Sequence, residues 1–166
     1  MKCLQCGSAM TTKRENVPYS ALPGTVLLDV EVSRCPTCGE YEVAIPAIDE
    51  LNRVLAQEVI RKRGRLNGAE IRFLRTYLGY SGTDFARLIG SAPATVSRWE
   101  SDAQEIGHHA DLLLRALVVL DKRVEEYPIT TFAEISDKEK SPTKSGPAYV
   151  LAPSPTRTWK TAELRA

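Results

Sequence analysis

Four cysteines near the start of the chain are the residues whose spacing most clearly predicts chemistry. They form two Cys-x-x-Cys pairs, Cys3 with Cys6 and Cys35 with Cys38. The two-residue spacing lets both sulfurs of a pair bind one tetrahedral ion at about 2.3 Å, and two pairs supply four thiolate ligands. In a reducing compartment this pattern favours metal binding over disulfides. We therefore expect a structural Zn²⁺ site formed by all four cysteines.

Other chemistry at these cysteines is less consistent with the pattern. A redox dithiol needs only one pair and a βαβ setting, and four thiolates leave no open position for the water of a catalytic zinc. His108 and His109 lie far away in sequence and fit a helix start better than a ligand role. The chain also shows no nucleophile with a base and no phosphate-binding glycine loop, so we do not expect an enzyme.

The elements that must position the cysteines are two short loops and the strands between them. Gly7 and Gly39 follow the two pairs, where a positive φ turns backbone N–H groups back toward thiolates. Segments 25–33 and 40–45 alternate apolar and polar residues as strands do. Residues 1–46 thus form a β-rich zinc module, and so small a module depends on its metal for much of its folding free energy.

A helix is predicted after Pro46, over residues 47–62, by apolar residues at steps of three or four. It continues into the basic segment 61–65, and we treat residues 47–66 as a connecting helix and linker. A basic run of this kind is either a solvated helix end or a linker that contacts phosphates. The sequence favours neither alternative.

The next domain, residues 67–127, is expected to be entirely helical. Helices are predicted over 69–78, from Ser81 to Gly90, from Pro93 to Glu100, and over 109–126. The second and third meet across the turn 90–92, as in a helix-turn-helix. We expect Phe85, Ile89, Val96 and Trp99 to face inward.

The outward face of the third helix is the expected DNA-contacting surface. It carries Ala94, Thr95, Ser97 and Arg98, and Thr83 and Arg87 of the preceding helix are further candidates. Net charge is only +1 for the whole chain, so phosphate contacts depend on local positive charge. We expect this charge from five arginines that precede or line that face: Arg65, Arg72, Arg75, Arg87 and Arg98.

The last helix and the segment after it raise two further expectations. The apolar face of helix 109–126 is wider than one helix of a small domain usually buries, which predicts packing against a second subunit. Residues 128–166 are rich in Pro, Ser, Thr and Lys and are expected to be mostly disordered. Trp159 and Leu164 are exceptions, and a segment that docks on a partner is the alternative for them. The chain has no predicted membrane helix or signal peptide, so we expect a cytoplasmic protein.

Residues 71–120 resemble the Xre/Cro-type helix-turn-helix repressors. The resemblance rests on Ser81, Phe85-Ala86, Ile89-Gly90 and Thr95-Val-Ser-Arg-Trp-Glu100. Together with Cys3-Leu-Gln-Cys-Gly7 and Cys35-Pro-Thr-Cys-Gly-Glu40, residues 1–125 resemble the MqsA antitoxin family with its YgiT-type zinc finger. The fold class expected is therefore α+β: a small β-rich module that binds zinc through four cysteines, an all-α Xre/Cro-type domain, and a disordered tail.

The resemblance implies a function. In that family the zinc domain binds and restrains a RelE-like ribonuclease toxin, and the helical domain dimerises on a palindromic operator and represses its own operon. An asparagine that contacts bases in the best-known member falls at Ala94, which leaves Arg98 as the main candidate for base contacts. A stand-alone transcriptional regulator with a structural zinc finger is the alternative.

Overall fold

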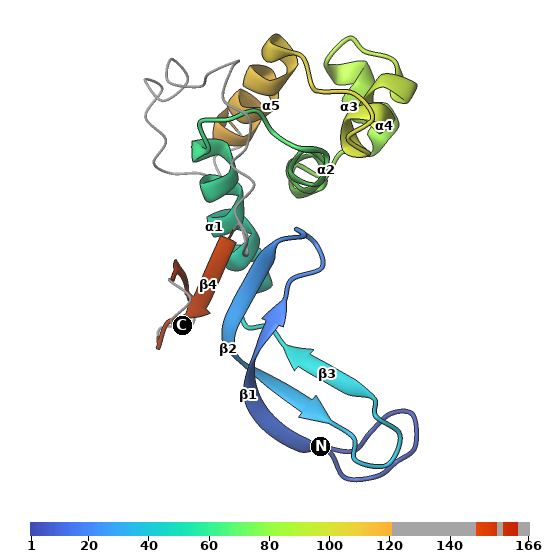
Figure 1. Cartoon of the computed structure of the whole chain (residues 1–166), viewed down its shortest axis with the longest axis vertical. Helices are drawn as coiled ribbons and strands as arrows, with labels where there is room; N and C mark the ends of the chain where they lie inside the picture. The colour runs from blue at the N-terminus through green and yellow to red at the C-terminus, as the bar shows by residue number, and fades with distance from the viewer. Residues whose placement is uncertain (121–148, 156–157, 163–166) are drawn as a thin grey trace. The chain divides into compact units, whose positions relative to one another are not determined.

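The computed structural model describes residues 1–120, 149–155 and 158–162, and the chain has a mixed α/β fold (Figure 1). Two compact units are present. The first comprises Met1–Leu51 together with Gly146–Ala166, and the second comprises Asn52–Ser145. The first unit contains the strands and the second contains most of the helical residues.

The described strands of the first unit form one five-stranded sheet (Figure 1). β2 is its central strand, paired antiparallel with β1 along one edge. Its other edge is shared by β3, antiparallel, and β4, parallel, and β5 pairs with β4. The bounds are β1 Thr11–Pro18, β2 Thr25–Arg34, β3 Tyr41–Ala44, β4 Tyr149–Pro153 and β5 Trp159–Thr161.

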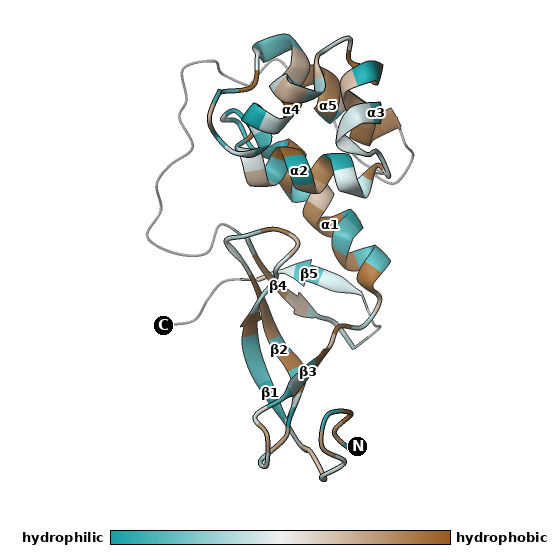
Figure 2. Cartoon of the chain, turned by 90° about the vertical axis from the view of Figure 1, so that its right-hand side faces the viewer, coloured by the Kyte–Doolittle hydropathy of each residue, from teal (hydrophilic) through white to brown (hydrophobic). Residues whose placement is uncertain are grey.

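A β-bulge sets which side chains of β2 are buried. The register between β1 and β2 shifts between Glu15 and Val17, and Asp29 adopts a φ of 53° opposite the shift. The backbone N–H of Asp29 donates to the Asn16 side chain at 3.1 Å, which holds this conformation. As a result, Leu27 and Val30 are both buried although they are three residues apart. β2 is accordingly more apolar than β1 in Figure 2.

The helices begin and end close to the predicted residues, because local capping signals determine their ends. Asn67 forms a capping box with Glu70, and the Ser81 hydroxyl accepts from the Asp84 N–H. Pro93 occupies the first turn of its helix. The bounds are α1 Ile48–Arg61, α2 Gly68–Tyr77, α3 Gly82–Leu88, α4 Pro93–Glu100 and α5 His108–Leu120. Residues 121–126 of the predicted last helix lie outside the described residues.

The core between α3 and α4 matches the predicted one except at Ile89, which is only half-buried. Phe85, Val96 and Trp99 are buried, as expected from their spacing. Leu88 is 48% exposed. Leu88 is the last residue of a helix of only seven residues, and such a short helix covers a narrow face of its neighbour.

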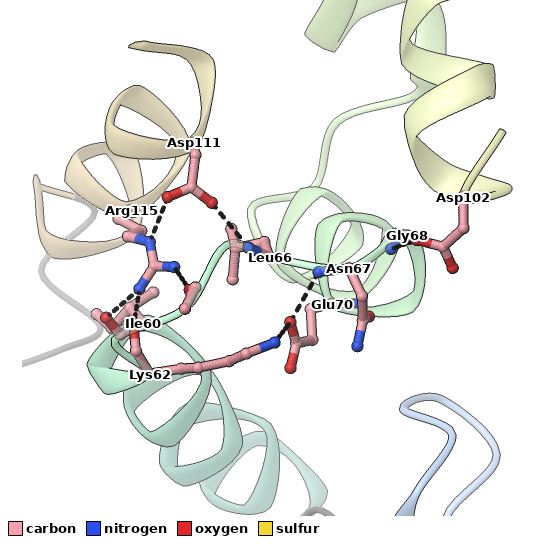
Figure 3. Close-up of polar contacts among 10 residues, drawn as sticks. Ile60, Lys62, Leu66, Asn67, Gly68, Glu70, Asp102, Asp111 and Arg115 are labelled. Carbon is pink, nitrogen blue, oxygen red and sulfur yellow. Dashed lines mark hydrogen bonds and ion pairs between the residues drawn. The ribbon is translucent and has the colours of Figure 1, made fainter. Parts of the chain in front are cut away.

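A buried ion pair joins α5 to the segment that follows α1 (Figure 3). Asp111 and Arg115 are both fully buried, and Arg115 donates to an Asp111 carboxylate oxygen at 2.9 Å. Three further Arg115 N–H groups donate to the carbonyls of Ile60, Lys62 and Gly64 at 2.6–2.8 Å. Asp111 also accepts the Leu66 N–H at 3.0 Å. The segment 60–66 is therefore fixed to the helical unit by backbone hydrogen bonds.

Three residues of the basic segment 61–65 are paired within the protein. Lys62 pairs with Glu70 at 2.8 Å, and both side chains are largely buried. Arg61 pairs with Glu58, and Arg65 donates to the Ile106 carbonyl. From Asn52 onward, α1 belongs to the helical unit, where Leu55 and Val59 are fully buried.

The expected disorder of the tail does not hold for residues 149–155 and 158–162. β4 and β5 lie there, with Leu151 fully buried and Trp159 only 3% exposed. The Trp159 indole N–H donates to the Pro46 carbonyl at 2.7 Å, so this tryptophan docks on its own chain. Residues 128–148, 156–157 and 163–166, including Leu164, lie outside the described residues.

Candidate metal centre and candidate nucleic-acid interface

The two Cys-x-x-Cys loops have the same backbone geometry. In each, the glycine N–H donates to the carbonyl of the first cysteine, from Gly7 to Cys3 at 2.9 Å and from Gly39 to Cys35 at 3.0 Å. The N–H of the first cysteine donates to the carbonyl five residues on, at 2.9 Å to Ser8 and 2.8 Å to Glu40 in the second loop. Gly7 and Gly39 have φ of 74° and 77°, as the sequence predicted.

The loops bring the four sulfur atoms together. All four Sγ atoms lie within 4.8 Å of one another, with Cys3 to Cys38 at 3.5 Å and Cys6 to Cys35 at 3.4 Å. Sulfurs around a tetrahedral ion with metal–sulfur bonds of about 2.3 Å lie about 3.8 Å apart. Each loop contributes one buried and one exposed cysteine. The cluster is therefore of the right size and composition to hold one metal ion.

The thiols of this cluster differ in acidity. Hydrogen bonds from the Ser8 side chain and backbone lower the pKa of Cys6 to about 6. A backbone hydrogen bond from Glu40 lowers the pKa of Cys38, but the neighbouring thiols and desolvation outweigh it and raise that pKa to about 12. Four thiolates at this spacing repel one another, so a cation is needed before all four can be deprotonated. Ser8 is a contributing residue that sequence spacing did not identify.

The six residues predicted to contact DNA all lie on α3 and α4. On α3, Thr83 and Arg87 are exposed. On α4, Ala94, Ser97 and Arg98 are exposed and Thr95 is half-buried. α4 is held from its opposite side by buried Val96 and Trp99. The turn between the helices contains Gly90 at φ 65°, and the Ser91 N–H donates to the Ala86 carbonyl at 2.8 Å.

The arginines expected near this face are not equally available. Arg75 is largely buried and donates to Glu100 at 2.5 Å and to the Tyr80 carbonyl, so it does not supply the exposed positive charge that was expected from it. Arg72 is exposed but also pairs with Glu100, at 3.3 Å. Arg87 pairs with Asp84. Within the described part of the chain, the Arg98 guanidinium forms no hydrogen bond or ion pair.

Part of the apolar face of α5 remains accessible. Leu114 and Val118 are fully buried, while Leu113 is 41% and Leu120 is 74% exposed.

The apolar character of α5 was predicted from the sequence, but the burial of its polar residues Asp111 and Arg115 was not. Nothing in their i, i+4 spacing distinguishes them from a surface pair.

No protein-family model matches the chain, and neither a curated protein nor a solved structure matches it. Among the described residues, no helix has the length and apolar character required to cross a bilayer. The interpretation of both candidate sites therefore rests on their own geometry.

Proposed function

We propose that this protein is a DNA-binding protein whose helix α4 lies in the major groove. The observation that carries the proposal is the outward face of α4, where Arg98 is exposed and has no partner among the described residues. An arginine in that position can donate two hydrogen bonds to O6 and N7 of guanine. Ala94 and Thr95 offer methyl groups suited to thymine. The Arg72–Glu100 and Arg75–Glu100 pairs support α4 from α2.

The metal in this proposal is a structural Zn²⁺ bound by Cys3, Cys6, Cys35 and Cys38. Zn²⁺ prefers four tetrahedral thiolates in structural sites, and such a set leaves no position for a reacting ligand. The ion supplies folding free energy to the two loops. Metal analysis of protein purified under reducing conditions should find one zinc per chain.

The full biological role that we propose is that of an antitoxin in a type II toxin–antitoxin pair. The partner would be a RelE-like ribonuclease bound by the zinc module, and a homodimer formed through α5 would repress its own operon at a palindromic site. This part of the proposal rests on the family resemblance.

A DNA-binding titration tests the proposed interface. With duplex from upstream of the protein's own coding region, Arg98→Ala should weaken affinity by about 1–3 kcal/mol and relax specificity at one base step. Arg61→Ala removes the same charge from α1, where Arg61 pairs with Glu58, and should have little effect. Equal affinity of Arg98→Ala and the unmodified protein would overturn the proposed interface.

The alternative function is a stand-alone regulator with a structural zinc finger. It shares the DNA interface, so only the partner separates the two roles. Co-expression with a small protein encoded beside the gene should yield a stable complex and suppress any ribonuclease toxicity if the chain is an antitoxin. Unchanged DNA binding without such a complex would favour the stand-alone regulator.

A further inference from the structure

The outward face of α4 combines one arginine with small side chains. Ala94, Ser97 and Arg98 are exposed, and Thr95 is half-buried. An α-helix turns by about 100° per residue, so Ala94 and Arg98 lie one above the other at the centre of this face. Thr95 and Ser97 lie on its two flanks. The contacts that α4 can make with bases in a groove are therefore limited to what these side chains offer.

This face contains no amide or free carboxylate with which to read a base. Asn and Gln recognise adenine through two hydrogen bonds, and Asp and Glu accept from cytosine. The sequence of α4, Pro93–Glu100, contains no Asn, Gln or Asp, and its one glutamate, Glu100, is occupied by ion pairs with two arginines of α2. Serine and threonine hydroxyls donate or accept and do not distinguish the bases. What remains is a guanine contact from Arg98 and methyl contacts from Ala94 and Thr95.

The guanine and the methyl group should belong to neighbouring base pairs. Side chains on an α-helix lean toward its N-terminus, so the Arg98 side chain extends over the turn that carries Ala94. The rise between these two residues is about 6 Å, which is less than two base-pair steps of about 3.4 Å. In B-DNA the C5 methyl of a pyrimidine lies in the major groove beside a guanine on its 3′ side. An arginine bonded to that guanine therefore lies against the methyl group.

Two pyrimidines carry this methyl group. Thymine and 5-methylcytosine share it and differ at position 4, where thymine has an oxygen and 5-methylcytosine an amino group. The hydroxyls of Thr95 and Ser97 can serve as partners for either group. The face therefore cannot reject 5-methylcytosine in favour of thymine, whereas it loses the methyl contact with cytosine or uracil.

We propose that α4 recognises the methyl group of a pyrimidine–guanine step. The protein then binds thymine–guanine and 5-methylcytosine–guanine steps alike and binds unmethylated cytosine–guanine steps weakly. Its ligand is duplex DNA in which cytosine methylation is read at this step. Ala94 and Thr95 determine the specificity for the methyl group, and Arg98 supplies the guanine contact. The inference rests on the proposed function, because it requires α4 to lie in the major groove.

Selection from random duplexes identifies the step to be tested. The full zinc-loaded chain and its Arg98→Ala variant are each used to select DNA, and the guanine that is enriched only by the unmodified protein is the one that Arg98 contacts. Thymine should be enriched directly 5′ of that guanine. Four duplexes are then made that differ only at this 5′ base, which is thymine, uracil, cytosine or 5-methylcytosine. Fluorescence anisotropy at one fixed salt concentration measures the four dissociation constants.

The proposal predicts two pairs of affinities. Thymine and 5-methylcytosine should give dissociation constants within about twofold of each other. Uracil, which is thymine without its methyl group, should bind about fourfold more weakly than thymine, and cytosine about fourfold more weakly than 5-methylcytosine. This is the loss expected when one methyl group is removed from an apolar contact.

A variant of α4 assigns the methyl contact to its residues. Ala94→Gly together with Thr95→Ser removes two methyl groups from the outward face, so the ratio of the uracil to the thymine dissociation constant should fall to about one. Thr76→Ser removes a methyl group from an exposed residue of α2 and is the control, for which the ratio should stay at about fourfold. Because each ratio compares two duplexes with one protein, a general loss of affinity cancels.

The outcomes separate this inference from the proposed function. If Arg98→Ala selected the same sequences as the unmodified protein, the proposed DNA interface and the inference would both be wrong. A guanine that depends on Arg98, with equal affinity for thymine and uracil or with 5-methylcytosine no better than cytosine, would leave the interface intact and overturn the inference alone. An unchanged ratio in the Ala94 and Thr95 double variant would likewise overturn it.

Discussion

At the scale of single residues, the thiols of Cys6 and Cys38 have pKa values that are shifted in opposite directions. Both thiols are exposed, but the pKa of Cys6 is lowered to about 6 and that of Cys38 is raised to about 12. Only the thiolate is alkylated, and its fraction grows as pH rises through the pKa. In the reduced, metal-free protein, Cys6 should therefore react with iodoacetamide well before Cys38 at about pH 7. Peptide mapping by mass spectrometry measures both rates, and bound metal should suppress them.

Hydrogen bonds from Ser8 are the main cause of the low pKa of Cys6. Ser8→Ala removes the side-chain contribution and should shift the onset of Cys6 alkylation to higher pH. Equal alkylation rates of Cys6 and Cys38 at neutral pH would contradict the assignment.

The Asp111–Arg115 pair should be essential for the stability of the helical unit. Arg115→Met leaves the buried Asp111 carboxylate without its cation and three backbone carbonyls without their Arg115 donor. Loss of one partner of a buried pair typically costs about 3–5 kcal/mol. The control is Arg87→Met, which breaks an ion pair with Asp84 that is mostly exposed on α3. It should cost less than about 1 kcal/mol.

Chemical denaturation followed by circular dichroism measures both free energies of unfolding. Similar values for Arg115→Met and Arg87→Met would show that the buried pair contributes no more than a surface pair. The two pairs also show a limit of sequence interpretation. Each consists of an aspartate and an arginine one helical turn apart, and only the tertiary contacts with segment 60–66 distinguish them.

At the scale of secondary structure, local signals predicted the helices well. Ser81, Pro93 and Gly90 specify helix ends through their own backbone and side-chain preferences, so they act wherever the helix lies in the fold. The cysteine loops were predictable for the same reason, since a ligand pair and its glycine are neighbours in sequence. β1 was not predicted, because its residues Thr11–Asn16 are polar and mostly exposed.

β4 and β5 illustrate what local sequence cannot show. Their segment is rich in proline and polar residues, which is typical of disorder, yet it pairs with a strand more than a hundred residues away. Burial of Leu151 and Trp159 depends on a groove made by β2 and Pro46, and no residue near them in sequence indicates that groove. The default expectation for this segment was therefore an exposed tail.

The start of α2 approaches the end of α4 so closely that Gly68 should be required there. A Cβ atom at position 68 would lie 2.6 Å from the carbonyl oxygens of Trp99 and Glu100. These are backbone atoms, so the helices must separate to accept alanine, which would also strain the Gly68 N–H bond to Asp102. We expect Gly68→Ala to destabilise the helical unit by about 1–3 kcal/mol.

Gly82 is the matched control for this substitution. It also opens a helix, but a Cβ atom there would meet nothing within 4 Å. Gly82→Ala should therefore leave the protein unchanged or stabilise it by about 0.4–1 kcal/mol. Thermal unfolding of both variants provides the comparison, and equal melting temperatures would contradict the close approach of α2 and α4.

At the scale of the whole molecule, the chain forms two units whose composition differs from the predicted domains. The zinc module was expected to end at residue 46 and to depend mainly on metal. The first unit instead includes β4 and β5, which add Leu151 and Trp159 to its core. The helical unit includes most of α1, which had been assigned to the connection between domains.

This division predicts separable consequences for deletion of residues 146–166. The deletion removes two of the largest apolar side chains from the core of the first unit, and each such loss typically costs about 2–5 kcal/mol. Because metal binding and folding are linked, a chelator should remove the metal from the truncated protein at least about tenfold faster. DNA affinity should stay within about twofold of that of the full-length protein, because α2–α5 lie in the other unit.

Deletion of residues 163–166 alone is the control, and it should change neither the rate of metal removal nor the DNA affinity. A loss of DNA affinity as large as that of Arg98→Ala would show instead that the C-terminal strands support the helical unit.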